Sequence, residues 1–247
     1  MCNSMFRHAI CSSGAEQPAH DRVVNAEHGL ALVVVLLSMS LICALSLALT
    51  LLASTEMRIA AHHRWSAETF FAADAAVERA ILDLSRAGDW TGVLNGAFVS
   101  TFVDGPPGVR ILTDGSRLDL SEATDTLNCG HASCSSDELI ANTVERPWGA
   151  NNPIWRLYAH APLSALSLSG SIDSRVYLMV WVADDPLETD ADPLVDGDES
   201  HGPNPGRGVL QLRAQAYGTA GSVQTIEVTL HRVLTRTRVL SWRVVRQ

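Results

Sequence analysis

The chain has 247 residues and a formal net charge of −9, a length that accommodates one or two domains with a buried core. The acidic balance argues against a nucleic-acid-binding surface, because phosphate binding needs clustered cations. All 18 basic side chains are arginine, which excludes enzymes that depend on a P-loop lysine, a Schiff-base lysine or a Ser-Lys dyad.

A long apolar run follows a polar N-terminal segment. Residues 29–55 carry no charge and are mostly Leu, Val, Ala and Ile. The run exceeds the roughly 20 residues that a helix needs to span a bilayer. It is also longer than the ~7–15-residue apolar core of a cleaved secretory signal. We therefore expect residues 30–55 to form a membrane-spanning helix.

The helical pattern continues beyond this run. Residues 56–87 contain neither Pro nor Gly and are rich in strong helix formers, so we expect the helix to extend over 56–88 and to stop at Gly88. Apolar residues recur at steps of mostly three and four, which predicts one buried face. These residues are Ile59, Ala67, Phe70, Phe71, Ala75, Val77, Ile81 and Leu82. A single-pass anchor with a globular domain would show the same pattern.

Two stretches carry a resemblance to a known family. The stretch HGLALVVVLL, from His28, and the later stretch TFFAADAAVERA, from Thr69 to Ala80, resemble the N-terminal region of type IV pilins and pseudopilins, most closely the PilX-like minor pilins. Members of this group carry a glycine just before the apolar run, which a prepilin peptidase recognises, and an alanine-rich stretch about 40 residues later. The resemblance covers about a quarter of the chain.

The resemblance implies specific processing and partners. Residues 1–29 would be a leader removed by the prepilin peptidase after Gly29, and Leu30 would become the N-methylated first residue. The protein would be held in the inner membrane with its C-terminal domain in the periplasm. It would then assemble with other minor and major pilins through the N-terminal helix, in pilus assembly.

Val34 departs from the common pilin pattern. The fifth residue of the mature chain is usually Glu, whose carboxylate is thought to pair with the terminal amine of the subunit ahead, in an apolar fibre core. A subunit with no neighbour ahead of it needs no such partner, so Val34 favours a position at or near the tip. The alternatives are a GspK-like tip pseudopilin of type II secretion and a single-pass anchored periplasmic binding module unrelated to pili.

Residues 89–247 predict a β-rich domain. Two strand-like pieces flank the turn at 104–108, and stronger strand patterns follow over 153–161, 175–184, 208–218 and 222–233. Residues 219–221 join the last two as a hairpin. Ile226, Val228 and Leu230 would face the core, with Thr225, Glu227, Thr229 and His231 solvated. We expect an α+β, pilin-like fold in which the long helix packs on an antiparallel sheet.

Cys129 and Cys134 are the only cysteines that follow the apolar run. If that run enters a membrane, this pair faces an oxidising compartment, where a disulfide persists. The five-residue separation can close such a bond. A zinc site that adds His131 is an alternative that lacks a nearby fourth ligand, and free thiols are a third.

An acidic stretch separates two of the strongest strand patterns. Eight carboxylates and no cation fall within residues 184–199, a density that disfavours order unless something neutralises it. Calcium takes six to eight oxygen ligands, and Asp190, Asp192, Asp196 and Asp198 could supply several. The spacing does not match an EF-hand loop, so a solvated acidic loop is the alternative.

The remaining polar residues do not indicate an enzyme. His62 and His63 are adjacent and do not form an i, i+4 metal pair, and His131, His160 and His201 have no nucleophile motif near them. We therefore expect no catalytic activity. The arginine-containing tail, residues 231–247, is typical of a solvated edge strand, or of a contact with an acidic neighbouring subunit.

Overall fold

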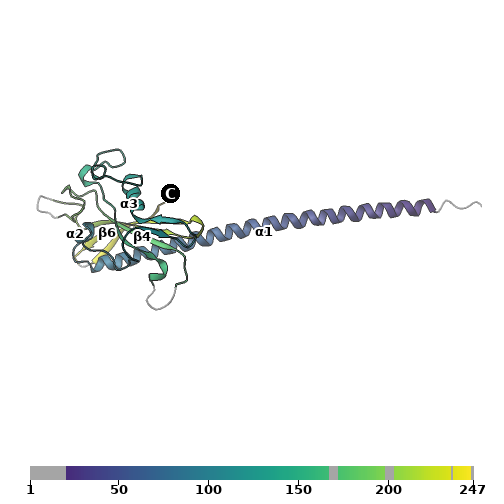
Figure 1. Ribbon diagram of the computed structural model, residues 1–247, viewed down its shortest axis with the longest axis horizontal. Helices are drawn as coiled ribbons and strands as arrows, with labels where there is room; N and C mark the ends of the chain where they lie inside the picture. The colour runs from purple at the N-terminus through teal and green to yellow at the C-terminus, as the bar shows by residue number, and fades with distance from the viewer. Residues whose placement is uncertain (1–20, 167–171, 198–202, 235, 246–247) are drawn as a thin grey trace, which may run out of the picture. The chain divides into compact units, whose positions relative to one another are not determined.

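The computed structural model describes residues 21–166, 172–197, 203–234 and 236–245, with side chains from residue 29 onward. The chain divides into two compact units, one ending at Arg58 and one beginning at Ile59. The first element is the 66-residue helix α1 (Asp21–Arg86), whose bounds include residues of both units (Figure 1). It ends two residues before Gly88, close to the predicted stop.

The second unit has a five-stranded antiparallel sheet in the order β3-β4-β5-β6-β7. Its strands are β3 (Arg156–Pro162), β4 (Tyr177–Asp184), β5 (Val209–Tyr217), β6 (Val223–Val233) and β7 (Arg236–Val245). Four of them match the predicted strands to within a few residues. The connection between β5 and β6 is the short turn η3 (Thr219–Gly221), as the sequence predicts, and β7 forms the edge expected from the tail.

The part of α1 within the second unit packs on one face of this sheet through small side chains. Ala72, Ala73, Ala76 and Ala80 are buried with Val77 and Leu84 against alternate residues of β4, β5 and β6. The predicted face is only partly correct, because Phe71 is 67% exposed and Ile59 and Leu82 are also exposed. Alanines let the helix backbone approach the sheet closely, so the buried face is centred on them and not on the larger side chains.

The opposite face of the sheet is also covered. Tyr177, Met179 and Trp181 alternate along β4 with the residues that face α1, and they pack with Leu120 in a second cluster. This cover includes the helix α3 (Leu120–Cys129) and residues Leu112 and Leu118. Every residue of β4 is therefore buried, because the strand has an apolar layer on both sides. The long apolar helix and the antiparallel sheet give the α+β layout that the sequence predicts.

Several short elements differ from the prediction or were not predicted. Of the two strand-like pieces around residues 104–108, only β1 (Val109–Ile111) forms, and it pairs with the unpredicted β2 (Arg117–Asp119). The other piece makes a single bridge, between Val103 and His160. The remaining short helices are α2 (Thr91–Leu94), α4 (Ser136–Leu139), η1 (Gly149–Asn151) and η2 (Leu163–Leu166).

The alternation predicted for β6 is correct at its apolar positions. Ile226, Val228 and Leu230 are buried, whereas Glu227 and its neighbours of the same parity are partly exposed. Thr225 is the exception: it was expected in solvent and is buried. It pairs with Gln215 of β5 and Val245 of β7, so strands on both sides enclose it.

Candidate functional site

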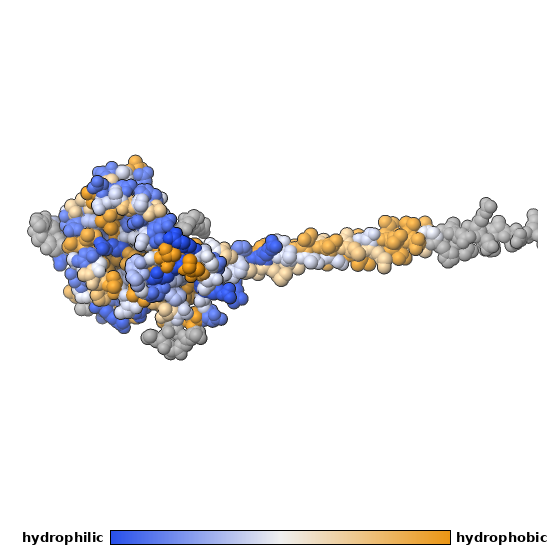
Figure 2. Space-filling model, viewed as in Figure 1, coloured by the Kyte–Doolittle hydropathy of each residue, from blue (hydrophilic) through white to orange (hydrophobic). Residues whose placement is uncertain are grey.

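The apolar half of α1 is exposed to its surroundings. Each large apolar side chain from Leu30 to Leu52 is at least 52% exposed, and Figure 2 shows hydrophobic residues along this part of the helix. Within the described part of the chain, α1 is the helix that is long and apolar enough to cross a membrane. A surface of this kind needs lipid or another protein as its neighbour.

The hydroxyl groups of this segment are satisfied inside the helix. Ser38, Ser40, Ser46 and Thr50 each donate a hydrogen bond of 2.8 Å to the carbonyl four residues earlier. Ser54 and Thr55 both donate to the carbonyl of Leu51. No hydroxyl between residues 30 and 55 therefore requires water, which suits an apolar environment.

The predicted processing point lies inside α1. The helix begins at Asp21, so Gly29 and Leu30 are both helical, and Leu30 is 71% exposed. A Cβ added at Gly29 would meet no atom within 4 Å. Of the predicted leader, residues 1–29, the part over 1–20 lies outside the described residues. Val34 is exposed, and its carbonyl accepts the hydrogen bond from Ser38.

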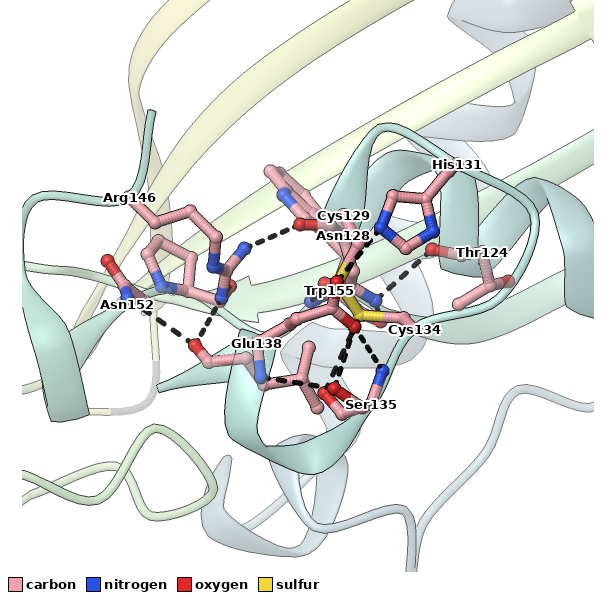
Figure 3. The surroundings of a disulfide bond; sticks show 12 residues. Thr124, Asn128, Cys129, His131, Cys134, Ser135, Glu138, Arg146, Asn152 and Trp155 are labelled. Atoms are coloured by element: carbon pink, nitrogen blue, oxygen red, sulfur yellow. Dashed lines mark hydrogen bonds and ion pairs between the residues drawn. A yellow bond between two sulfur atoms is a disulfide. The ribbon is translucent and has the colours of Figure 1, made fainter. Parts of the chain in front are cut away.

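A disulfide joins Cys129, the last residue of α3, to Cys134 (Figure 3). This is the pair that the sequence favours for such a bond. Glu138 lies close to both sulfurs, but a thiolate, not a disulfide, binds metal, and His131 contacts Glu138 instead. The contacts therefore give no support to the alternative zinc site.

The surroundings of the disulfide are held by an arginine. Arg146 donates to the carbonyls of Asn128, Leu139 and Pro153, and the Asn128 side chain bonds to both the amide and the carbonyl of Trp155. Figure 3 shows these groups on the same side of the sheet as α3. The network fixes the loop after α3 through both terminal nitrogens of Arg146, whereas its Nε is buried without a hydrogen-bond partner.

Of the four aspartates predicted as calcium ligands, the three that are described, Asp190, Asp192 and Asp196, do not come together as one group of ligands. Asp196 is occupied, because its two oxygens accept from the Gly208 amide at 2.7 Å and from Arg232 at 3.0 Å. Asp192 is exposed and accepts from the Leu194 amide. Asp190 Oδ1 accepts from the Asp192 amide at 3.1 Å, while its Oδ2 lies beside Gly197; Asp198 lies outside the described residues. The sequence shows the charge density but not which side chains turn inward.

The buried acidic residues of this loop are others. Asp184, at the end of β4, is 3% exposed and Glu188 is 2% exposed. Asp184 Oδ1, Glu188 Oε1 and both amide atoms of Asn204 are buried without a hydrogen-bond partner. Buried polar groups are almost always paired, so this group of orphaned atoms requires an explanation. The sequence signal for Asp184 and Glu188 was only their membership of the acidic stretch.

Burial and mutual repulsion disfavour the charged forms of these acids. Burial, reinforced by Glu188 and other nearby carboxylates, raises the pKa of Asp184 to about 9. Burial also raises the pKa of Glu188 to about 7, with Asp190 and Asp196 adding to the effect and the Gly197 amide opposing it. A cation at this position would reverse this preference, because an adjacent positive charge favours ionised carboxylates.

No protein-family model, curated protein or solved structure matches this chain. Its function must be inferred from its own residues. Two features of the described residues call for a partner outside the folded chain. They are the exposed apolar half of α1 and the buried acids after β4.

Sequence reasoning missed a polar cluster around Asp104. Asp104 Oδ1 lies 3.0 Å from His160 Nδ1, and the Tyr177 hydroxyl donates to both oxygens of Asp104. Arg110 pairs with the same carboxylate. Burial lowers the pKa of His160, with Asp104 acting in the opposite direction. Among the described residues, the side chains that hydrogen-bond to the His160 ring are those of Asp104 and Tyr177.

Proposed function

We propose that the protein is a minor pilin-like subunit that takes part in the assembly of a type IV pilus or a related fibre. One observation carries the proposal. The helix α1 has an apolar half whose side chains are exposed and whose hydroxyls are bonded internally, and it has a second half built into a folded domain. A segment of this kind serves both as a membrane anchor and as a packing surface between subunits.

The resemblance in the sequence supports the same function. Gly29 stands where the prepilin peptidase would cut, so that Leu30 becomes the first residue of the mature protein. The alanine-rich stretch of the resemblance, residues 69–80, contains Ala72, Ala73, Ala76 and Ala80, which pack α1 against the sheet. The family motif therefore coincides with side chains that have a structural task in this chain.

The apolar half offers small residues for contact with other helices. Ser38, Ser40, Cys43, Ala44, Ser46 and Ala48 lie among the leucines, and small side chains let helices approach closely where no water is present. The subunit would be stored in the inner membrane through this segment and then moved into the fibre, with the β-rich domain on the outside. Its task would be assembly and not catalysis.

The absence of a carboxylate at position 34 supports a place at or near the tip. A shaft subunit needs an acidic side chain here to pair with the terminal amine of its neighbour, whereas Val34 offers only an apolar surface. A subunit that starts the fibre has no neighbour ahead of it. We propose initiation or tip placement on this basis.

The deciding experiment is co-expression of the full chain with an active prepilin peptidase, followed by intact-mass measurement. The expected product has lost residues 1–29 and carries one added methyl group. Gly29→Leu should abolish the cut, because the peptidase reads the glycine. Gly88→Leu is the matched control, since a Cβ there also meets no atom within 4 Å, and it should be cut normally. A wild-type chain that stays uncut while a known pilin is processed would favour a single-pass anchored module instead.

A further inference from the structure

The connection between β4 and β5 contains buried oxygens that the rest of the protein does not compensate. Asp184 and Glu188 are more than nine-tenths buried, and each has one carboxylate oxygen without a hydrogen-bond partner. Asn204 is equally buried, with neither amide atom bonded. Leaving such groups unpaired lowers stability, and more so for a charged group, so the fold needs something that binds them.

Glu188 and Asn204, together with Asp190, converge on one place beside Gly197. A Cβ at this residue would collide with Asn204 Nδ2, Asp190 Oδ2 and Glu188 Oε2. The Gly197 amide donates to Glu188 Oε2 at 2.9 Å. The side chains of Glu188, Asp190 and Asn204 therefore lie against the backbone of Gly197, and only glycine, which has no Cβ, allows them to approach so closely.

The charge and chemistry of the group indicate a hard divalent cation. Its members are carboxylates and an amide, and oxygen donors of this kind suit calcium or magnesium, whereas zinc and copper favour nitrogen and sulfur. Calcium accepts irregular geometry and six to eight ligands, and magnesium demands a near-ideal octahedron. An irregular loop with carboxylates and an amide at uneven spacing fits calcium better.

We propose that Glu188, Asp190 and Asn204 bind one calcium ion beside Gly197. A half-turn of the Asn204 amide exchanges its two atoms and presents Oδ1 to the ion. Asp196 is excluded from this set because Arg232 and the Gly208 amide hold its oxygens. The set shares only Asp190 with the ligands that the sequence predicts, and it does not depend on the proposed function.

Calcium would then fix the connection between two core strands. Glu188 lies shortly after β4 (Tyr177–Asp184), and Asn204 lies shortly before β5 (Val209–Tyr217). Glu188 is tied to a neighbouring segment through its carbonyl, which accepts from Asn151 at 2.8 Å. A bound ion would join these segments at one point and neutralise their repulsion.

The test uses the full chain in detergent micelles, stripped with a chelator and dialysed against radioactive calcium. We expect about one ion per chain, with a dissociation constant of about 10⁻⁴–10⁻³ M, as in extracellular calcium modules. The midpoint of thermal unfolding should rise with calcium and much less with the same concentration of magnesium. Glu188→Gln and, separately, Asp190→Asn should each weaken binding at least about tenfold, because each removes a charged ligand.

Two features of the design separate lost binding from lost folding. In chelator, both variants should melt at or above the wild-type temperature, since each removes one repelling charge. Asp192→Asn is the matched control, because Asp192 belongs to the same loop but is exposed, and it should bind calcium like the wild type. The proposal is overturned by absence of binding at millimolar calcium, or by an equal loss of affinity in Asp192→Asn. Cleavage at Gly29 reports on a different property, so either idea can fail alone.

Discussion

Arg232 forms a buried ion pair with Asp196, with 3.0 Å between Nη2 and Oδ2. The same guanidinium donates to the carbonyl of Gly88 and lies 5.1 Å from the ring centre of Trp90. One side chain on β6 therefore holds both the acidic loop and the segment that follows α1. Asp196 is 4% exposed at its side chain, so it depends on this partner for its charge.

Replacement of Arg232 by alanine should destabilise the protein by about 2–3 kcal/mol, somewhat less than the 3–5 kcal/mol of a fully buried pair, because Arg232 keeps some exposure. Chemical denaturation of the full chain in detergent micelles measures the free energy of unfolding. Arg243→Ala is the control, since Arg243 is 73% exposed and Arg213 still pairs with Glu227. Its cost should stay below about 1 kcal/mol. Equal costs for the two variants would contradict the assigned role.

The close packing of α1 on the sheet predicts sensitivity to size at Ala76, which is 1% exposed. Ala76→Leu should lower the free energy of unfolding by about 1–3 kcal/mol, because the extra methylenes overfill the layer between the helix and the sheet. Ala60→Leu makes the same change on an exposed position of the same helix and should have little effect. If Ala76→Leu proved neutral, the alanine-lined contact would be looser than described.

His160 should make stability dependent on pH. Burial lowers its pKa below the ordinary 6.5, so the unfolded chain takes up this proton more readily than the folded one. The contribution of His160 to the free energy of unfolding is complete above pH 6.5 and is lost as the pH falls through that value. His160→Gln should flatten this loss below pH 6.5. His63→Gln, at an exposed position, should keep the wild-type profile, and identical profiles for all three proteins would refute the assignment.

The disulfide between Cys129 and Cys134 should stabilise the protein by about 2 kcal/mol, the value expected for a short closed loop. A variant with both cysteines changed to serine should unfold at lower denaturant, and the oxidised wild type should shift to match it once a reductant is added. Cys43→Ser, which changes the exposed cysteine of α1, should alter neither curve. A reductant-insensitive wild type would show that the bond does not form in solution.

The main elements could be predicted from the sequence because their patterns are strong and local. The helix 30–88 shows as a long apolar run that continues without Pro or Gly until Gly88, and four strands show as apolar runs between turn residues. The short helix α3 was missed although its boundaries carry signals, namely Asp119 capping Ser121 and Glu122, and Gly130 in the left-handed region with φ of 78°. A ten-residue helix between turns offers too few periods for apolar spacing to show, so only the capping residues could have revealed it.

The sequence indicated where acidic side chains gather but not which of them are buried. Charge density pointed to the stretch 184–199, yet the inward turn of Asp184 depends on where β4 ends against β5, which is a long-range property. The contact between Asp104 and His160 joins residues 56 positions apart. No local pattern encodes it, since it arises when the loop before β1 meets β3.

The internally bonded hydroxyls of the apolar half of α1 have a mechanical consequence. A helix that donates every hydroxyl to its own backbone has no hydrogen bond to break when its surroundings change from acyl chains to neighbouring helices. Such a transfer is decided by shape and contact area alone. The segment from Leu30 to Thr55 could therefore pass from lipid to protein surroundings, or back, without breaking a side-chain hydrogen bond.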